Sequence, residues 1–214
     1  MEDVLEVYHL PYNHQRPVIC LDELPFQMLG EKVEPLPMKE GQEKKFDSEY
    51  ERKGTAAVFL AFEPLTGKRL VRVYPQRTKT DYCRFQQEVV KAWPQAEVIV
   101  QVQDNLNTHH ASSFYENLPP LEARALSRRI EFHYTPKKAS WLNMAEMELS
   151  ALARQCLARR IADIETLRRE LDSIVKERNK LAVKFKWQFT VENAREKLSR
   201  HYEKVILKTS VTKH

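Results

Sequence analysis

Two apolar runs that each end in an aspartate are the feature that most constrains the fold of this chain. The segment AEVIVQVQDN (96–105) has the composition of a buried strand and stops at Asp104, and RPVICLDE (16–23) stops in the same way at Asp22. Ligands of open α/β sheets bind beyond the carboxyl ends of strands. If the two strands are neighbours, their aspartates come close together. The alternative is that each aspartate only caps the turn after its strand.

The remaining segments predict a mixed sheet with helices on its faces. In chain order, we expect the first strand to be followed by a long polar surface loop (30–54), a hairpin (55–75) and a helix (78–94). After the second aspartate-bearing strand we expect two short helices, a fifth strand (130–136) and a helix (140–160). Further helices continue to the end, with Asp163 and Thr190 as N-caps. This is the order of a ribonuclease-H-like α/β domain with a C-terminal helical extension, although several other α/β folds would also fit it.

Two neighbouring aspartates indicate a divalent cation, because carboxylates held close together repel unless a proton or a metal lies between them. Mg²⁺ prefers oxygen ligands and keeps several waters, which leaves room for a phosphate. A third acidic ligand would come from a helix packed over the same end of the sheet. In SWLNMAEMELSALARQC, Glu146 and Glu148 fall on opposite borders of the apolar stripe, so periodicity leaves both candidates open.

Charge is distributed unevenly along the 214 residues. Residues 151–214 hold 16 Lys and Arg against 8 Asp and Glu, whereas the first 150 hold 19 against 22. This asymmetry favours a polyanion partner for the basic part; a solvated helical face with i,i+4 pairs is the alternative. The three widely spaced cysteines suggest neither a disulfide framework nor a zinc site. No stretch is long and apolar enough for a membrane helix, so we expect a cytoplasmic protein.

Four stretches closely resemble the transposases of the bacterial insertion sequence 630 family, relatives of the mariner-like elements: CLDE, RKGTAAVFLAFEPLTGK, VQDNLNTHH and FHYTPKKASWLNMAEMELSALARQCL. The resemblance implies a ribonuclease-H-like catalytic domain with an Asp–Asp–Glu triad that binds two divalent ions, Mg²⁺ or Mn²⁺. Matched position by position, the triad is Asp22, Asp104 and Glu146, and Glu148 is then expected at the surface or behind the site.

The activity implied by the resemblance is two-metal cleavage of phosphodiester bonds at the ends of a DNA element, followed by strand transfer into target DNA at a TA dinucleotide. Asn105, His109 and Asn143 match positions beside the triad and are expected to orient the site or to contact a phosphate; a purely structural hydrogen bond is the alternative for each. Lys137 and Lys138 are placed at the mouth of the same cleft, where they could neutralise phosphates.

Three other side chains are expected to be structural. Trp141 and Leu142 are predicted to be core residues that anchor the start of the helix, with stacking on a nucleic-acid base as the alternative. His133 lies inside an alternating strand.

The sequence departs from the family pattern in three ways. Between Asp104 and Glu146 there are 41 residues, more than is usual in the wider superfamily, and Ala139 stands where similar sequences often have Gly. Third, no N-terminal helix-turn-helix region is seen. We therefore divide the chain into a linker remnant (1–15), a catalytic domain (16–160) and a basic C-terminal helical region (161–214).

The expected partners are the double-stranded DNA of element ends and target, a second copy of the chain in the DNA complex, and a DNA-reading portion supplied separately. The location implied is the nucleoid of a bacterial cytoplasm, without a membrane partner. Two other functions are left open by the sequence: a ribonuclease-H-like nuclease without strand transfer, and a truncated DNA-binding remnant that does not transpose.

Overall fold

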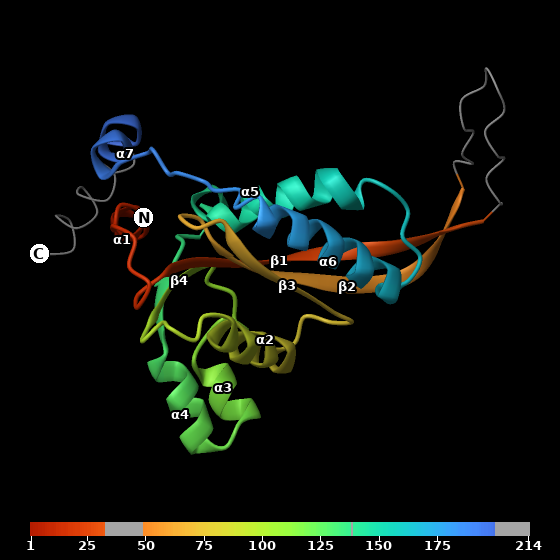
Figure 1. Cartoon of the computed structure of the whole chain (residues 1–214), viewed down its shortest axis with the longest axis horizontal. Coiled ribbons are helices and arrows are strands. Elements are labelled where there is room, and N and C mark those ends of the chain that lie inside the picture. Colours follow the sequence, from red (N-terminus) through yellow and green to blue (C-terminus); the bar gives the residue numbers. More distant parts are fainter. Residues whose placement is uncertain (33–48, 138, 200–214) are drawn as a thin grey trace, which may run out of the picture.

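A mixed five-stranded sheet forms the centre of the fold (Figure 1). The computed structural model describes residues 1–32, 49–137 and 139–199. The first three strands are consecutive and antiparallel, and the last two extend the sheet beyond β1 in parallel orientation. In the order β3-β2-β1-β4-β5, the strands are β3 (Lys68–Tyr74), β2 (Tyr50–Glu63), β1 (Val18–Glu31), β4 (Ile99–Gln103) and β5 (Ile130–Tyr134). This is the ribonuclease-H-like arrangement that the sequence predicts.

Helices cover both faces of the sheet, and each face has its own apolar core (Figure 1). On one face lie α5 (Met144–Leu152) and α6 (Ile164–Lys180), with α1 (Glu2–Tyr8) and α7 (Val191–Lys197) at its end; on the other lie α2 (Lys79–Ala92), α3 (Ser112–Asn117) and α4 (Pro120–Arg128). Within the described ranges, no helix is long and apolar enough to cross a membrane.

The first strand is longer than predicted. β1 runs to Glu31 and pairs with β2 as far as Glu31 with Tyr50, so part of the expected loop 30–54 is strand, and residues 33–48 lie outside the described ranges. The half of the β1–β2 pair that lies farthest from Asp22 has few buried side chains, so its hydrophobic pattern is weak. Backbone hydrogen bonds between the two strands nevertheless make this part a regular β-structure. As a result, Asp22 lies inside β1 and not at its end.

Residues 140–160 do not form one helix, contrary to the prediction. A 3₁₀ turn (Ser140–Leu142) precedes α5, and a π-helical segment (Ala153–Leu157) follows it. The break arises at Asn143, which has extended backbone angles and caps α5 by accepting a hydrogen bond from the Ala145 N–H. Leu142 is fully buried as expected, but Trp141 is 47% exposed, so its assignment to the core is wrong.

The predicted caps of the C-terminal helices are confirmed. Asp163 accepts from the Thr166 N–H at 2.8 Å, and Thr190 forms a capping box with Asn193. Both helices pack against the body of the domain: α6 lies along β3, and Arg195 of α7 pairs with Glu2 of α1 at 2.8 Å. The expected linker 1–15 includes α1, whose Val4 and Leu5 are fully buried.

Candidate active site

Three carboxylates from separate elements lie around one pocket. The last residue pair between β1 and its parallel neighbour β4 is Cys20 with Val102, and Asp22 lies two residues after Cys20. Asp104 comes directly after β4, and Glu146 lies in the first turn of α5. Because β1 and β4 run in the same direction, both aspartates reach the same end of the sheet. All three acidic residues line a pocket of about 530 Å³.

The carboxyl of Asp22 has a raised pKa. Burial, together with the charges of Asp104, Glu146 and Glu23, raises the pKa of Asp22 to about 7, although a hydrogen bond from the Glu23 N–H at 2.8 Å acts in the opposite direction. In the absence of a cation, part of the Asp22 population is therefore protonated near neutral pH.

The raised pKa makes the stability of the metal-free protein depend on pH. Because folding raises the pKa of Asp22 from its ordinary 3.8 to about 7, the folded state binds the proton more tightly, and stability falls as pH rises through this range. Asp22→Asn replaces the ionisable carboxyl by a neutral amide and so removes this decrease in stability at high pH. At pH 8 without divalent ions, we expect the variant to gain about 1–3 kcal/mol in unfolding free energy, a gain reduced by the new amide that faces Asn143.

Urea unfolding of the parent and of Asp22→Asn at pH 8 and pH 4.5 measures this effect. The gain should shrink towards zero at the lower pH, where the parent carboxyl is protonated in the folded state. An equal gain at both pH values, or none at pH 8, would show that repulsion among the carboxylates does not govern the stability of this site.

Asn143 connects the helix of Glu146 with the strand of Asp22. It is 1% exposed, and its Nδ2 donates to the Leu21 carbonyl at 2.9 Å and to Oδ2 of Asp22 at 3.3 Å, while its Oδ1 caps α5. One side chain thus sets the start of α5 and orients one oxygen of Asp22. Because Asn143 contacts both a backbone carbonyl and a carboxylate, its orienting role stays a prediction beside that of a structural hydrogen bond.

His109 bridges two carboxylates behind the pocket. Its Nε2 lies 2.7 Å from Oε2 of Glu23, its Nδ1 bonds Oδ1 of Asp104, and its ring stacks on Tyr82 with centroids 4.8 Å apart. Burial lowers the pKa of His109, but the two carboxylates outweigh this and raise it to about 9. His109 is therefore a buried cation at neutral pH that holds Asp104 from one side.

Glu23 was missed as a site residue. Alternate residues of a strand point to opposite faces, so Asp22 turns towards α5 while Glu23 turns towards the face of α2 and α3, where it meets His109. Glu23 also lies 3.3 Å from Nε of Arg77, and both residues line the pocket. The only sequence signal was its position beside Asp22, because the partners of Glu23 are more than 50 residues away along the chain.

The other predicted site residues are not among the described residues that line the pocket. Asn105 and Lys137 are exposed, and neither belongs to the described residues that line the pocket. Lys138 lies outside the described residues. His133 is structural, as expected, because it bonds Asp3 of α1 at 2.9 Å and Glu131 at 3.1 Å.

Glu148 is not a surface residue, contrary to one of the two expectations for it. It is fully buried and accepts two hydrogen bonds of 2.7 Å from Arg178 of α6, while Nε of Arg69 of β3 lies 2.8 Å away. The face of α5 that carries Glu148 is covered by α6 and β3, which the periodicity of α5 alone could not show. This ion-pair cluster lies behind the helix that carries Glu146.

The donors around the pocket suit a hard divalent cation. Asp22, Asp104 and Glu146 offer oxygen atoms only, and their mutual repulsion is what a cation would relieve. In the arrangement seen, no three His, Cys, Asp or Glu side chains among the described residues are grouped closely enough to hold an ion, and one oxygen of Asp104 is engaged by His109. Because the three carboxylates offer only oxygen donors, the chemistry of the donor set fits Mg²⁺ or Mn²⁺.

Comparisons with known proteins identify the family and the fold of this chain. A family model described as a DDE superfamily endonuclease matches residues 17–168. The structure is similar to that of a Mos1 mariner paired end complex with Mn (TM-score 0.56, 15% identity, 84% of this chain and 55% of that one). It is also similar to a mariner Mos1 paired end complex with Mg (TM-score 0.51, 16% identity, 85% and 60%).

The likeness to these structures is one of fold. This chain spans little more than half of the Mos1 chains that it matches. No curated protein matches the chain.

Proposed function

The chain belongs to the DDE superfamily of endonucleases, and from this premise we propose that it is the catalytic domain of a DNA transposase of the insertion sequence 630 type. The observation that carries the proposal is the pocket lined by Asp22, Asp104 and Glu146. The Mos1 structures with a similar fold are paired end complexes. By analogy we propose that this chain also binds double-stranded DNA. Two copies of the chain would bind it together with a DNA-reading portion that is supplied separately.

In this proposal Asp22, Asp104 and Glu146 hold two divalent ions, Mg²⁺ or Mn²⁺. When bound, such ions lower the pKa of a water nucleophile and stabilise the leaving oxygen of a phosphodiester. The protein supplies the geometry: β1 and β4 fix the two aspartates, and the Asn143 cap fixes the first turn of α5 with Glu146.

Other residues of the chain keep these ligands in place. His109, held by Glu23, directs one oxygen of Asp104, and Asn143 directs one oxygen of Asp22. Arg77 lies on the pocket wall with its side chain 48% exposed, so it can meet a phosphate group that enters. The 3′-hydroxyl freed by cleavage would then attack target DNA, at a TA dinucleotide by resemblance.

DNA cleavage by the purified chain tests the proposal. Supercoiled plasmid is incubated with the protein and Mg²⁺, Mn²⁺ or EDTA, and the nicked products are examined for 3′-hydroxyl ends and for strands joined to a second DNA. We expect nicking only with a divalent ion, and Glu146→Gln should reduce it to background because one ligand carboxylate becomes a neutral amide.

The outcomes separate the competing functions. Nicking without any joined product, in the presence of DNA carrying element ends, would favour a ribonuclease-H-like nuclease. DNA binding with no metal-dependent nicking by the parent, or nicking that Glu146→Gln leaves unchanged, would contradict the assignment of this pocket.

A further inference from the structure

An exposed tryptophan stands at the entrance to α5. Trp141 is 47% exposed, and its ring stacks beside Trp187 with centroids 6.3 Å apart and an interplanar angle of 19°. Phe189 meets the same ring edge-on at 5.8 Å. We call Trp141, Trp187 and Phe189 the aromatic platform. Tyr8 supports it from behind, 5.2 Å from Trp187.

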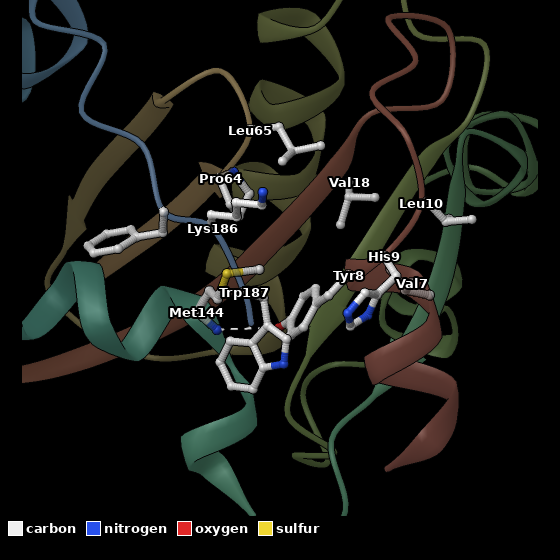
Figure 2. A pocket seen from close by; sticks show the side chains of 11 residues that line it. Val7, Tyr8, His9, Leu10, Val18, Pro64, Leu65, Met144, Lys186 and Trp187 are labelled. Atoms are coloured by element: carbon white, nitrogen blue, oxygen red, sulfur yellow. Dashed lines mark hydrogen bonds between the residues drawn. The ribbon is translucent and has the colours of Figure 1, made fainter. Parts of the chain in front are cut away.

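Lysines adjoin the aromatic platform in the chain and in space. In the segment KFKWQF (184–189) the aromatic residues are half-buried against the core, whereas Lys184 and Lys186 are exposed. Figure 2 shows Lys186 and Trp187 on the wall of a small, mostly apolar pocket of about 190 Å³. Lys197 of α7 lies over the ring of Phe189 at 5.4 Å. Lys197 thus adds positive charge to the aromatic platform itself, whereas Figure 2 shows that Lys186 points towards Pro64, on the other side of the segment from Trp187.

The aromatic platform lies close to the carboxylates of the candidate active site. Trp141 is two residues from Asn143, so their Cα atoms are at most about 7 Å apart. Asn143 in turn donates to Asp22 at 3.3 Å. Figure 2 shows that Trp187 lies next to Tyr8, whose hydroxyl accepts from the Met144 N–H at the start of α5 (3.3 Å). A nucleic-acid strand with a phosphate at the carboxylates would therefore have a neighbouring nucleotide near Trp141.

We propose that the aromatic platform is a binding site for an unpaired nucleobase of DNA, which stacks on the exposed face of Trp141 while Lys197 holds an adjoining phosphate. Aromatic side chains within a positive groove are the usual means of binding single-stranded nucleic acid, because every base has a π-face. A lone exposed tryptophan needs no explanation. Here, however, the ring packs against two aromatic neighbours, one of which, Phe189, lies under the ammonium group of Lys197. The inference rests on the proposed function for its ligand, DNA.

DNA binding measured without metal tests this site separately from cleavage. Two labelled duplexes of identical sequence, one blunt and one with a short single-stranded 3′ extension, are titrated in EDTA by fluorescence anisotropy. The parent should bind the extended duplex more tightly than the blunt one. Trp141→Ala should weaken binding of the extended duplex about tenfold and leave the blunt duplex almost unchanged. Trp141→Phe, which keeps a π-face, should retain most of the preference.

Leu121→Ala is the matched control, because Leu121 is 84% exposed and lies on α4, on the opposite face of the sheet. It should leave binding of both duplexes unchanged. An equal loss on both duplexes by Trp141→Ala, an unaltered preference, or a change of oligomeric state would overturn the proposal. If the extended duplex is preferred through Trp141 but no metal-dependent cleavage occurs, the stacking site stands and the proposed catalytic function fails.

Discussion

Replacing Glu148 with alanine is expected to lower the free energy of unfolding by about 3–5 kcal/mol, the cost of breaking a buried ion pair by removing one partner. Glu148 is fully buried, and the guanidinium groups of Arg69 and Arg178, which are 3% and 9% exposed as residues, both rely on its carboxylate. The substitution leaves two buried positive charges facing each other. Urea unfolding followed by circular dichroism measures the loss.

Glu146→Ala is the control for this prediction, since Glu146 lies two residues earlier on the same helix but faces the pocket of carboxylates. It should change the unfolding free energy by less than about 1 kcal/mol, as expected for a partly exposed side chain without such partners. Replacing the cluster as a whole, by Glu148→Leu with Arg69→Met and Arg178→Met, should restore much of the stability because no buried charge is left unpaired. Equal losses from Glu146→Ala and Glu148→Ala would contradict the assigned roles.

Asp104→Ala is expected to abolish both the binding of Mn²⁺ at the pocket and metal-dependent DNA cleavage. Asp104 is the carboxylate that follows β4, and His109 keeps one of its oxygens fixed. Without it, Asp22 and Glu146 alone give too few protein oxygens to hold two ions, and cleavage should fall by at least about a thousandfold, the scale seen when one member of a catalytic triad is removed. Titration calorimetry with Mn²⁺ and plasmid nicking measure the two effects independently.

Glu97→Ala provides the matched control, because Glu97 is an exposed carboxylate just before β4, at the opposite end of the same strand. It should leave both Mn²⁺ binding and nicking at the level of the parent. Undiminished binding of Mn²⁺ by Asp104→Ala would show that the ions lie elsewhere. Loss of cleavage with intact Mn²⁺ binding would assign Asp104 to DNA contact and not to the metal.

Much of the fold could be predicted because its signals are local. The hairpin of β2 and β3, the helix α2, and the strands β4 and β5 are each encoded by apolar periodicity and turn residues within a few positions. The caps of α6 and α7 are hydrogen bonds from a backbone N–H to a side chain three residues away: Thr166 to Asp163, and Thr190 and Asn193 to each other. Such contacts form wherever the helix forms, so the sequence is enough to place them.

The candidate site was only partly predictable. Asp22 and Asp104 stand out because each follows an apolar run, but the choice of Glu146 over Glu148 came from a family resemblance, since helical periodicity places both beside the core. The structure turns Glu146 to the pocket and Glu148 to two arginines. That division depends on which elements cover α5, and α6 lies too far along the chain for a local pattern to reveal it.

The sequence by itself determined most of the order of strands and helices, the caps of α6 and α7, and the two aspartates that follow apolar runs. Only the tertiary structure decided that β1 continues past Asp22, that Glu23 reaches His109, and that Trp141 faces solvent. The physical reason is the same in each case. These features arise from strand pairing, burial and ion pairs between distant residues, such as the 86 positions that separate Glu23 from His109. Local propensity encodes elements, whereas the environment of a side chain is set by whatever packs against it.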